Sequence, residues 1–405
     1  MEKLPELAAI FTKMHLSQSG KKPRGRRYNT KEKIMCLTIL KQSQKGYNLL
    51  EKLFALPTKR SLQKILSCVN LSPGINNCII KHLEKCAKKL PEEKRICSLI
   101  FDEVALTPSL YYQKEAQLVV GFEDNGTTRT KNIADHALVL MIKSLTDKYK
   151  QPVAFTFCQS ATKSYDLKII IKEAIQKITS TGLIIVATVC DQSQTNMSAI
   201  NALIKETNET YLRDGVENKS RTFEVNGNKI FPIYDPPHLL KGLRNNLLTK
   251  DLKFVQDGEI KIAKWKHLDM LFELDTGEDD VRNLNKLTEA HIIKDKIPKM
   301  KVSHAAQVFS QRVSATMRFA VRHKILPQEC HGTADLLLLV DKLFDSFNSS
   351  NYKESKKPFR TALKTNSPHI KLWNDTLPVL KSMEFINVKR RHTKDCAGAF
   401  HKFFY

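Results

Sequence analysis

Two apolar, β-branched segments that each end on an aspartate constrain the fold of this chain most strongly. Residues 96–106, ICSLIFDEVAL, contain Asp102, and residues 183–191, LIIVATVCD, end on Asp191 and continue into Gln-Ser-Gln-Thr-Asn. Short apolar runs of this kind are typical of strands that are buried in a sheet. We therefore expect two core strands that place Asp102 and Asp191 at one edge of a rigid sheet.

The segments around these two strands predict an α/β domain. Three further segments rich in strand formers follow Asp102, at residues 110–124, 137–147 and 151–160. Helical spacing then appears at 166–179 and 194–207, on either side of the second core strand. This order of strands and helices matches an RNase H-like fold. Beyond residue 215, a hairpin with its turn at Asn226-Gly227 leads into a region whose patterns are mainly helical.

Three short helical patterns precede the sheet. They cover residues 30–42, 47–56 and 59–66, and we expect Thr30 to cap the first, Gly46 to end it, and Thr58 to cap the third. The third pattern carries Lys59, Arg60 and Lys64. Such a trio resembles a helix-turn-helix, whose last helix faces DNA. The alternative is a small helical packing domain without a role in DNA binding.

Basic residues are concentrated near the N-terminus. The whole chain has a net charge of +24, and residues 1–100 alone hold 21 Lys and Arg against 7 Asp and Glu. This imbalance favours a polyanionic partner, most often nucleic acid, although a well-solvated surface is the alternative. Residues 21–27, KKPRGRR, are interpreted as a nuclear-localisation element, an arm that contacts phosphates, or a plain linker.

The remaining composition predicts an intracellular protein without a membrane partner. No apolar run approaches the roughly 20 residues that span a bilayer, and the N-terminus lacks the order of a signal peptide. The nine cysteines include no C-x-x-C pair, so neither a zinc site nor disulfides are expected.

Asp102 and Asp191 are the first candidate site. Phosphoryl transfer on nucleic acid commonly uses two divalent ions, and Mg²⁺ prefers carboxylate oxygens that are held rigidly. Strand ends would supply that rigidity. The alternative is that both aspartates simply terminate strands.

Residues 234–248, YDPPHLLKGLRNNLL, form the second candidate site. Asp235 suits an N-cap and Pro236 the first helical position, while Lys241 and Arg244 lie one turn apart. A helix start with nearby cations is suited to phosphate. Asp345 and Asn348, three residues apart in LFDSFN, could hydrogen-bond a base edge, the carboxylate accepting from a guanine N–H. The alternative is a capped surface helix with ordinary charges.

Several of these motifs together resemble the P element transposase family, including its THAP-domain-containing vertebrate relatives. The matching segments are, in chain order, SLIFDEVAL with YYQKEAQLVVGFED, VCDQSQTN, YDPPHLLKGLRNNLL and LFDSFNSS. The resemblance implies a helix-turn-helix, an RNase H-like catalytic domain of the retroviral-integrase type, and a mainly helical GTP-binding insertion. It also implies Mg²⁺-dependent DNA cleavage and strand transfer, with GTP as a cofactor.

The resemblance assigns roles to six residues. Asp102 and Asp191 match the first two acids of the catalytic triad and would be metal ligands. Asp235 and Lys241 match residues of the insertion that contact GTP, as do Asp345 and Asn348. The expected partners are DNA, as transposon ends or target, GTP, and a second copy of the chain in a homo-oligomer. The expected location is the nucleus.

The chain departs from the family pattern in two places. It has no C2CH cysteine pattern of a THAP zinc domain, and no Leu-Glu-Asn-Phe-Phe segment that would supply the third catalytic acid; Glu384 stands in a different context. Cleavage is therefore expected to be impaired. The alternative functions are a domesticated, catalytically inactive DNA-binding or regulatory protein, and a non-functional transposase fragment.

The expected domain order follows from these assignments. A basic segment (1–28) precedes the helix-turn-helix-like domain (29–94) and an incomplete RNase H-like domain (95–215). The GTP-binding insertion (216–395) and a truncated tail (396–405) complete the chain.

Overall fold

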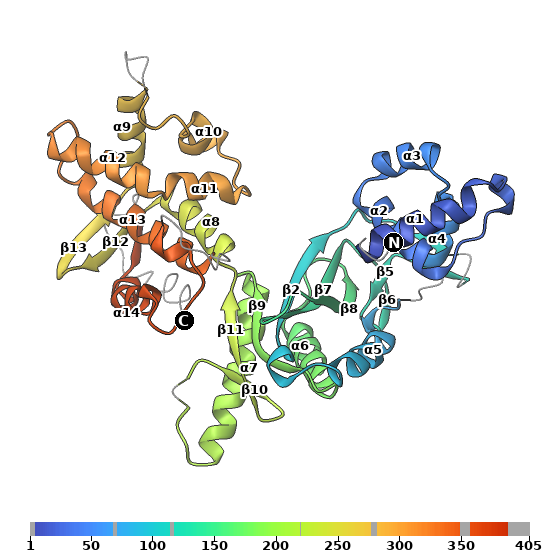
Figure 1. The fold of residues 1–405 in the computed structure, drawn as a ribbon. Coiled ribbons are helices and arrows are strands. Elements are labelled where there is room, and N and C mark those ends of the chain that lie inside the picture. Colours follow the sequence, from blue (N-terminus) through green and yellow to red (C-terminus); the bar gives the residue numbers. More distant parts are fainter. Residues whose placement is uncertain are drawn as a thin grey trace. The chain divides into compact units, whose positions relative to one another are not determined.

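The fold was analysed in a computed structural model that describes residues 5–67, 71–113, 117–218, 220–276, 282–348 and 357–387. The chain divides into two compact units, Met1–Pro73 and Gly74–Tyr405 (Figure 1). The tail expected at 396–405 lies outside the described residues.

The first unit is a small helical domain with its own core. Its helices are α1 (Glu6–Ser19), the 3-10 turn η1 (Pro23–Gly25), α2 (Thr30–Gln42), α3 (Gln44–Leu53) and α4 (Lys59–Ser67). The fully or nearly fully buried core side chains are Met14, Met35, Cys36, Tyr47, Leu56 and Leu62. The Tyr47 hydroxyl donates to the Pro57 carbonyl at 2.6 Å, which fixes the turn between α3 and α4. The predicted helices are thus present.

Two predicted helix boundaries in this unit were wrong. Asn29, rather than Thr30, caps α2, because its side chain accepts from the Glu32 N–H while the Glu32 carboxylate accepts from the Asn29 N–H. This reciprocal capping box needs a cap residue three positions before a Glu, which Asn29 satisfies. Gly46 does not end the helix either. The break falls at Ser43, whose extended backbone and side-chain bond to the Gly46 N–H start α3.

The second unit begins with a mixed sheet. Its strands are β1 (Gly74–Ile75), β2 (Ile96–Ala105), β5 (Phe122–Asp124), β6 (Arg129–Ile133), β7 (His136–Ser144), β8 (Lys150–Cys158), β9 (Ile184–Cys190), β10 (Phe223–Val225) and β11 (Asn228–Tyr234). Within the described residues their order is β10-β11-β9-β2-β7-β8-β5-β6, with β1 paired to β8. A separate hairpin pairs β3 (Tyr111–Gln113) with β4 (Leu118–Val120). The strands and helices of this sheet domain follow one another in the order predicted for an RNase H-like fold.

The two predicted core strands are neighbours in the middle of this sheet. β9 pairs with β2 and with β11 in parallel, whereas β2 pairs with β7 antiparallel. The Asn226-Gly227 turn joins β10 to β11 as expected, with φ values of 52° and 74° that suit these two residue types. The expected start of the insertion at residue 216 precedes β10 and β11, which belong to the sheet.

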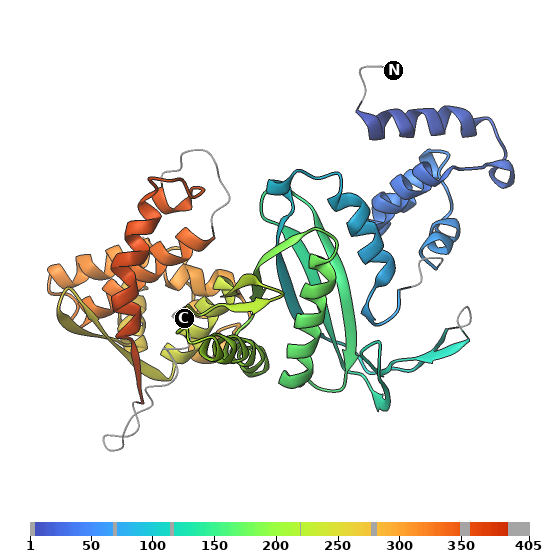
Figure 2. The same cartoon turned by 90° about the horizontal axis from the view of Figure 1, so that it is seen from below.

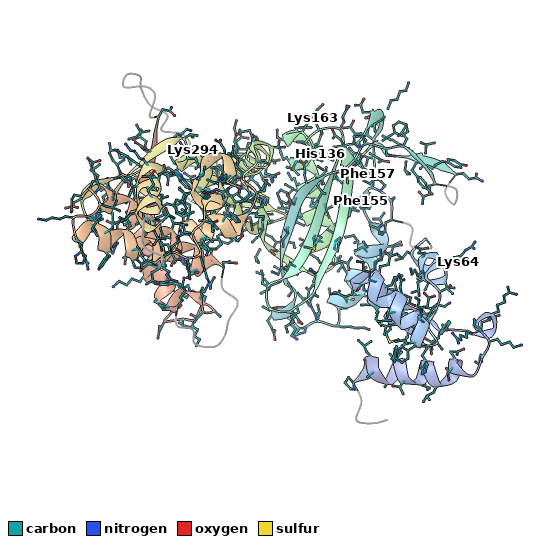
Figure 3. All side chains as sticks on the ribbon, turned by 90° about the horizontal axis from the view of Figure 1, so that it is seen from above. Lys64, His136, Phe155, Phe157, Lys163 and Lys294 are labelled. Carbon is teal, nitrogen blue, oxygen red and sulfur yellow. The ribbon has the colours of Figure 1, made fainter. Side chains whose placement is uncertain are left out.

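Helices α5 (Asn77–Ala87), α6 (Ser164–Thr179) and α7 (Gln194–Arg213) pack on one face of the sheet, and α6 is seen against the strands in Figure 2. A 3-10 turn, η2 (Glu92–Lys94), leads into β2. The strands contribute Leu99, Phe101, Leu138 and Leu140 to the shared core, and the helices contribute Ile171, Ile175 and Leu203. On β8, Phe155 and Phe157 lie next to each other with ring centroids 5.5 Å apart (Figure 3). Cys97 and Cys190 are buried within their strands, where cysteine acts as a small hydrophobic residue.

Residues 236–387 form a mainly helical region with a small sheet. The helices are α8 (Pro236–Leu247), α9 (Trp265–Asp275), α10 (Glu289–Ile292), η3 (Lys294–Lys296), α11 (Val302–Val308), α12 (Gln311–Arg322), α13 (Cys330–Phe347), η4 (Pro358–Arg360) and α14 (Pro368–Lys381). The strands are β12 (Lys250–Gln256), β13 (Glu259–Ala263) and β14 (Glu384–Asn387), in the order β13-β12-β14. The helical patterns did not predict this sheet. They also did not predict the break at Phe309 and Ser310 that separates α11 from α12.

A buried charge cluster joins three elements of this region. Asp335 on α13 is 3% exposed and lies 2.6 Å from Lys261 Nζ of β13 and 2.5 Å from Arg318 Nη2 of α12. His331, one turn before Asp335, is 3.3 Å from the same carboxylate. Close packing accompanies the cluster, because a Cβ on Gly332 would lie 2.8 Å from the Ile262 carbonyl oxygen. One carboxylate thus holds α12, α13 and β13 together.

Of the helices in the described part of the chain, none has the length and apolar character needed to span a bilayer.

Candidate active site and nucleotide site

Asp102 and Asp191 lie side by side at the sheet edge. Ile100 of β2 is the register partner of Val189 of β9; Asp102 stands two residues further along β2, and Asp191 directly follows the last residue of β9. Neighbouring strands are about 4.8 Å apart, so the two carboxylates emerge level with each other. Asp102 is exposed and Asp191 is half-buried. Both charges act on Cys190: burial foremost, and then Asp191 and Asp102, raise the pKa of that thiol to about 12.

Each carboxylate is held through one oxygen. Asp191 Oδ1 accepts from the Ser193 N–H at 3.0 Å and from Asn196 Nδ2 at 2.6 Å. Asp102 Oδ1 accepts from the Glu103 N–H at 2.9 Å. Among the described residues, Oδ2 of each aspartate accepts no hydrogen bond. The pair therefore presents two carboxylate oxygens without a hydrogen bond from the described residues, and carboxylate oxygen is the ligand type that Mg²⁺ prefers.

Asn196 and Ser193 were not singled out in the sequence, although the signal was there. Ser193 caps α7 by accepting from the Asn196 N–H, and the buried Asn196 side chain then turns back to Asp191. Asp191 follows its strand, and the helix N-cap Ser193 comes two residues later. This spacing places the Asn196 side chain next to Asp191. No group of three or more His, Cys, Asp and Glu side chains within the described ranges could hold a metal ion.

Asp235 lies one strand further along the same edge. Tyr234 of β11 is level with Cys190 of β9, and the Asp235 N–H donates to the Cys190 carbonyl at 2.9 Å. The Asp235 carboxylate caps α8 by accepting from the His238 N–H, and it is 2.6 Å from His238 Nδ1. The prediction of an Asp235 N-cap with Pro236 at the first helical position is confirmed. His238 serves this cap.

Helix α8 carries two buried cations without carboxylate partners. Lys241 is 8% exposed and, among the described residues, makes no hydrogen bond or ion pair. Arg244, one turn later, is fully buried; it donates to Asn245 Oδ1 and to the Lys299 carbonyl, while its Nη1 has no partner. Burial lowers the pKa of Arg244. Uncompensated buried charge is costly, so this face of α8 is suited to an anion.

Asp345 lies in a cavity of about 480 Å³ in the same region, where it is 5% exposed. Two cations of its own chain already contact it: Lys357 Nζ at 2.7 Å from Oδ2 and Arg360 Nε at 3.0 Å from Oδ1. Neighbouring Asp341 is 3.4 Å from Lys357, and burial raises its pKa. No sequence pattern indicated Lys357 and Arg360, which lie 12 and 15 residues beyond Asp345.

The cavity does not gather the four nucleotide residues expected from the sequence. Its walls are formed by residues 284–287, 303–313 and the segment around Asp345, Lys357 and Arg360. Asp235 and Lys241 on α8 do not line it, and Asn348 ends α13 as an exposed C-cap. α8 and α13 do pack together, around an apolar pocket that includes Leu240, Leu243 and Phe344. Phe344 lines both cavities.

The fold and these sites define an RNase H-like protein with a second, mainly helical region inserted after the strand next to the candidate metal pair. The family described as "TNP-like, RNase H N-terminal domain" matches residues 71–204, and "TNP-like, GTP-binding insertion domain" matches residues 237–361. The chain therefore contains the two TNP-like transposase domains and is a distant homologue of P transposase and THAP9.

Individual relatives support this assignment. The chain is 24% identical to human DNA transposase THAP9 over 80% of its length, and 25% identical to the Transposable element P transposase of Drosophila melanogaster over 82%. The matched parts are 35% and 41% of those proteins, so the chain spans well under half of either. The fold is similar to that in the Drosophila P element transposase strand transfer complex, with a TM-score of 0.72 and 22% identity, covering 95% of this chain and 80% of that chain.

Proposed function

We propose that this chain is a transposase-derived protein that binds DNA and GTP and carries a two-aspartate metal site of the transposase type. One observation carries the proposal: Asp102 and Asp191 stand level at the ends of adjacent parallel strands, each with an oxygen that accepts no hydrogen bond from the described residues. A solved structure of similar fold is a Drosophila P element transposase strand transfer complex. DNA, as transposon ends or target, is the expected substrate class, and the nucleus is the expected location.

Asp102 and Asp191 would hold Mg²⁺. The chemistry supplied there would be activation of a nucleophile for attack on a phosphodiester and neutralisation of charge on the leaving oxygen. The protein contributes rigid placement, because Asn196 and Ser193 fix the rotamer of Asp191 and leave its second oxygen available. Groups that orient a metal ligand in this way usually matter for metal affinity.

Removing the Asp191 carboxylate is expected to abolish metal binding at the pair. We expect titration calorimetry to detect Mn²⁺ binding by the unaltered chain and none by Asp191→Ala. Any Mg²⁺- or Mn²⁺-dependent nicking of plasmid DNA should be lost with it. Asn196→Ala should weaken metal binding by about 10- to 100-fold, because Asp191 loses its orienting hydrogen bond.

The control is Asp214→Ala, which removes an exposed carboxylate at the end of α7. Equal Mn²⁺ binding by Asp191→Ala and the unaltered chain would refute the metal site. Mn²⁺ binding without nicking of any DNA would favour the catalytically inactive, DNA-binding alternative.

GTP is proposed to bind with its phosphates near Lys241 and its base at Asp345 and Asn348. Lys241 is buried and has no partner among the residues that the structure describes, which supports a phosphate at the first position. At the base position, a carboxylate accepts hydrogen bonds from N1–H and N2–H of guanine, whereas adenine offers no such pair of donors. Asp235 caps α8 and so orients the helix that carries Lys241.

To bind a guanine base, the Asp345 carboxylate must give up an ion-pair partner from its own chain. Because Arg360 presents N–H donors to the Asp345 carboxylate, it occupies the edge that guanine would use. Arg360→Ala is therefore expected to strengthen GTP binding by about two- to fivefold, the range expected for an ion pair whose arginine is half exposed. Fluorescence titration with a labelled GTP measures the change.

Lys364→Ala, at an exposed position close by in the sequence, is the control and should leave affinity unchanged. If Arg360→Ala instead weakens GTP binding, Arg360 is itself a ligand to the nucleotide and does not compete with it.

A further inference from the structure

The basic segment at residues 21–27 is folded against the helical unit. η1 (Pro23–Gly25) is closed by a hydrogen bond from the Gly25 N–H to the Lys22 carbonyl at 2.8 Å. Gln18, which is 6% exposed at the end of α1, accepts from Lys21 Nζ at 3.4 Å and from the Arg27 N–H at 3.1 Å. The Arg27 guanidinium also donates to the Arg24 and Arg26 carbonyls. Gln18 thus anchors both ends of the segment, so a plain flexible linker does not describe it.

This folded segment forms one wall of a cavity of about 510 Å³. The opposite walls come from α2, α3 and the start of α4. The lining residues are Pro23, Arg24, Arg26, Arg27, Tyr28, Lys33, Glu51, Leu56, Thr58 and Ser61. Four of them are cations and one, Glu51, is an anion. None of these four cations forms an ion pair within the described residues.

Two further features of the cavity suit an anionic oxygen. α4 begins here, with Thr58 Oγ1 accepting from the Ser61 N–H, so the positive end of the helix dipole faces this wall. The Tyr28 hydroxyl is buried and makes no hydrogen bond with the described residues. Burial raises the pKa of Tyr28, so the hydroxyl keeps its proton and remains a donor.

We propose that this cavity, named here the arm cavity, binds a backbone phosphate of duplex DNA, with Arg24 and Lys33 as its principal contacts. The inference deepens the proposed DNA binding and rests on it. A polymer of phosphates is favoured over a single anion, because Met1–Pro73 holds 15 Lys and Arg against 4 Asp and Glu.

The position of the arm cavity also gives it a geometric role. It lies at the start of α4, whose exposed Arg60 and Lys64 project further along the helix (Lys64 is labelled in Figure 3). A phosphate held at the first turn would fix how α4 meets the duplex. Phosphate contacts position a protein on DNA, and base contacts supply its specificity.

The test compares two charge-matched double variants of the full chain. Arg24→Gln with Lys33→Gln alters the arm cavity, whereas Lys13→Gln with Lys45→Gln removes two exposed charges elsewhere in the same unit. Binding to a 30-base-pair duplex of arbitrary sequence is measured by fluorescence anisotropy at several salt concentrations. Thermal melts confirm that all proteins are folded.

The cavity variant is expected to bind about tenfold or more weakly and to lower the salt slope by about 2, since two phosphate contacts are lost. The control variant should change affinity less than about threefold and the slope by less than about 1. Equal losses of DNA affinity in both variants would refute phosphate binding in the arm cavity, although the proposed DNA binding would stand. No binding of duplex DNA by the unaltered chain would instead overturn the proposed function. Binding to anionic lipid vesicles but not to DNA would overturn both.

Discussion

Lys241→Met is expected to weaken GTP binding by about 10- to 100-fold, the range of a charge-assisted hydrogen bond. Lys241 is buried on α8 and lacks any partner among the described residues, so phosphate oxygens would be its natural partners. Methionine keeps the aliphatic stem and removes only the charge. Titration with a labelled GTP gives the affinity.

Lys241→Met should also affect the stability of the nucleotide-free protein, and there the effect should be neutral or favourable. An uncompensated buried ammonium costs free energy, so Lys241→Met should leave the nucleotide-free protein at least as stable in a thermal melt. Lys266→Met, at an exposed position on α9, controls for loss of a nearby positive charge. Unchanged GTP affinity in Lys241→Met would remove Lys241 from the nucleotide site. A lower melting temperature for Lys241→Met than for the unaltered chain would show that the Lys241 charge is compensated in the nucleotide-free protein.

Asp335→Ala is expected to destabilise the region 236–387 by about 3 kcal/mol, because it leaves Lys261 and Arg318 without their shared carboxylate. Calorimetry should show the corresponding transition fall by roughly 5–10 °C. Asp295→Ala, an exposed carboxylate of the same region, should change it little. A shift equal to that of Asp295→Ala would contradict a structural role for the cluster.

The cluster also predicts acid lability. Burial alone raises the pKa of Asp335, but the Lys261 hydrogen bond and the charges of Lys261, Arg318 and His331 outweigh it and hold the pKa below its ordinary value. The stability contributed by such a carboxylate is fully present above the unfolded pKa of about 4 and is lost as pH falls through the lower folded value. Asp335→Ala should therefore show a flatter stability profile below about pH 4 than the unaltered chain.

The sheet was predictable from the sequence because its central strands are marked by composition. Continuous apolar, β-branched runs around Leu99 and Ile185 favour buried strands, and the Asn226-Gly227 turn defines a hairpin. The strand ends predicted that Asp102 and Asp191 share a sheet edge, but not that their strands are direct neighbours in this register. The register depends on hydrogen bonding between strands more than 80 residues apart.

The insertion was harder to predict, because tertiary contacts override local patterns there. β12, β13 and β14 lie among strong helical periodicities, and β14 pairs with a strand about 130 residues earlier. The occupation of Asp345 by Lys357 and Arg360 depends on how the chain returns to α13. Caps were partly predictable: Asp235 and Thr58 follow simple rules, whereas Asn29 required the reciprocal bond with Glu32 to be considered.

The connection between the sheet and α8 is as short as it can be. β11 ends at Tyr234 and α8 begins at Pro236, so a single residue, Asp235, joins them. Its N–H is bonded to the strand of Asp191 while its carboxylate caps the helix of Lys241. We therefore expect a displacement of α8 along its axis to be transmitted to the sheet edge that carries Asp102 and Asp191. Binding of a nucleotide near Lys241 would then be mechanically coupled to the proposed metal site.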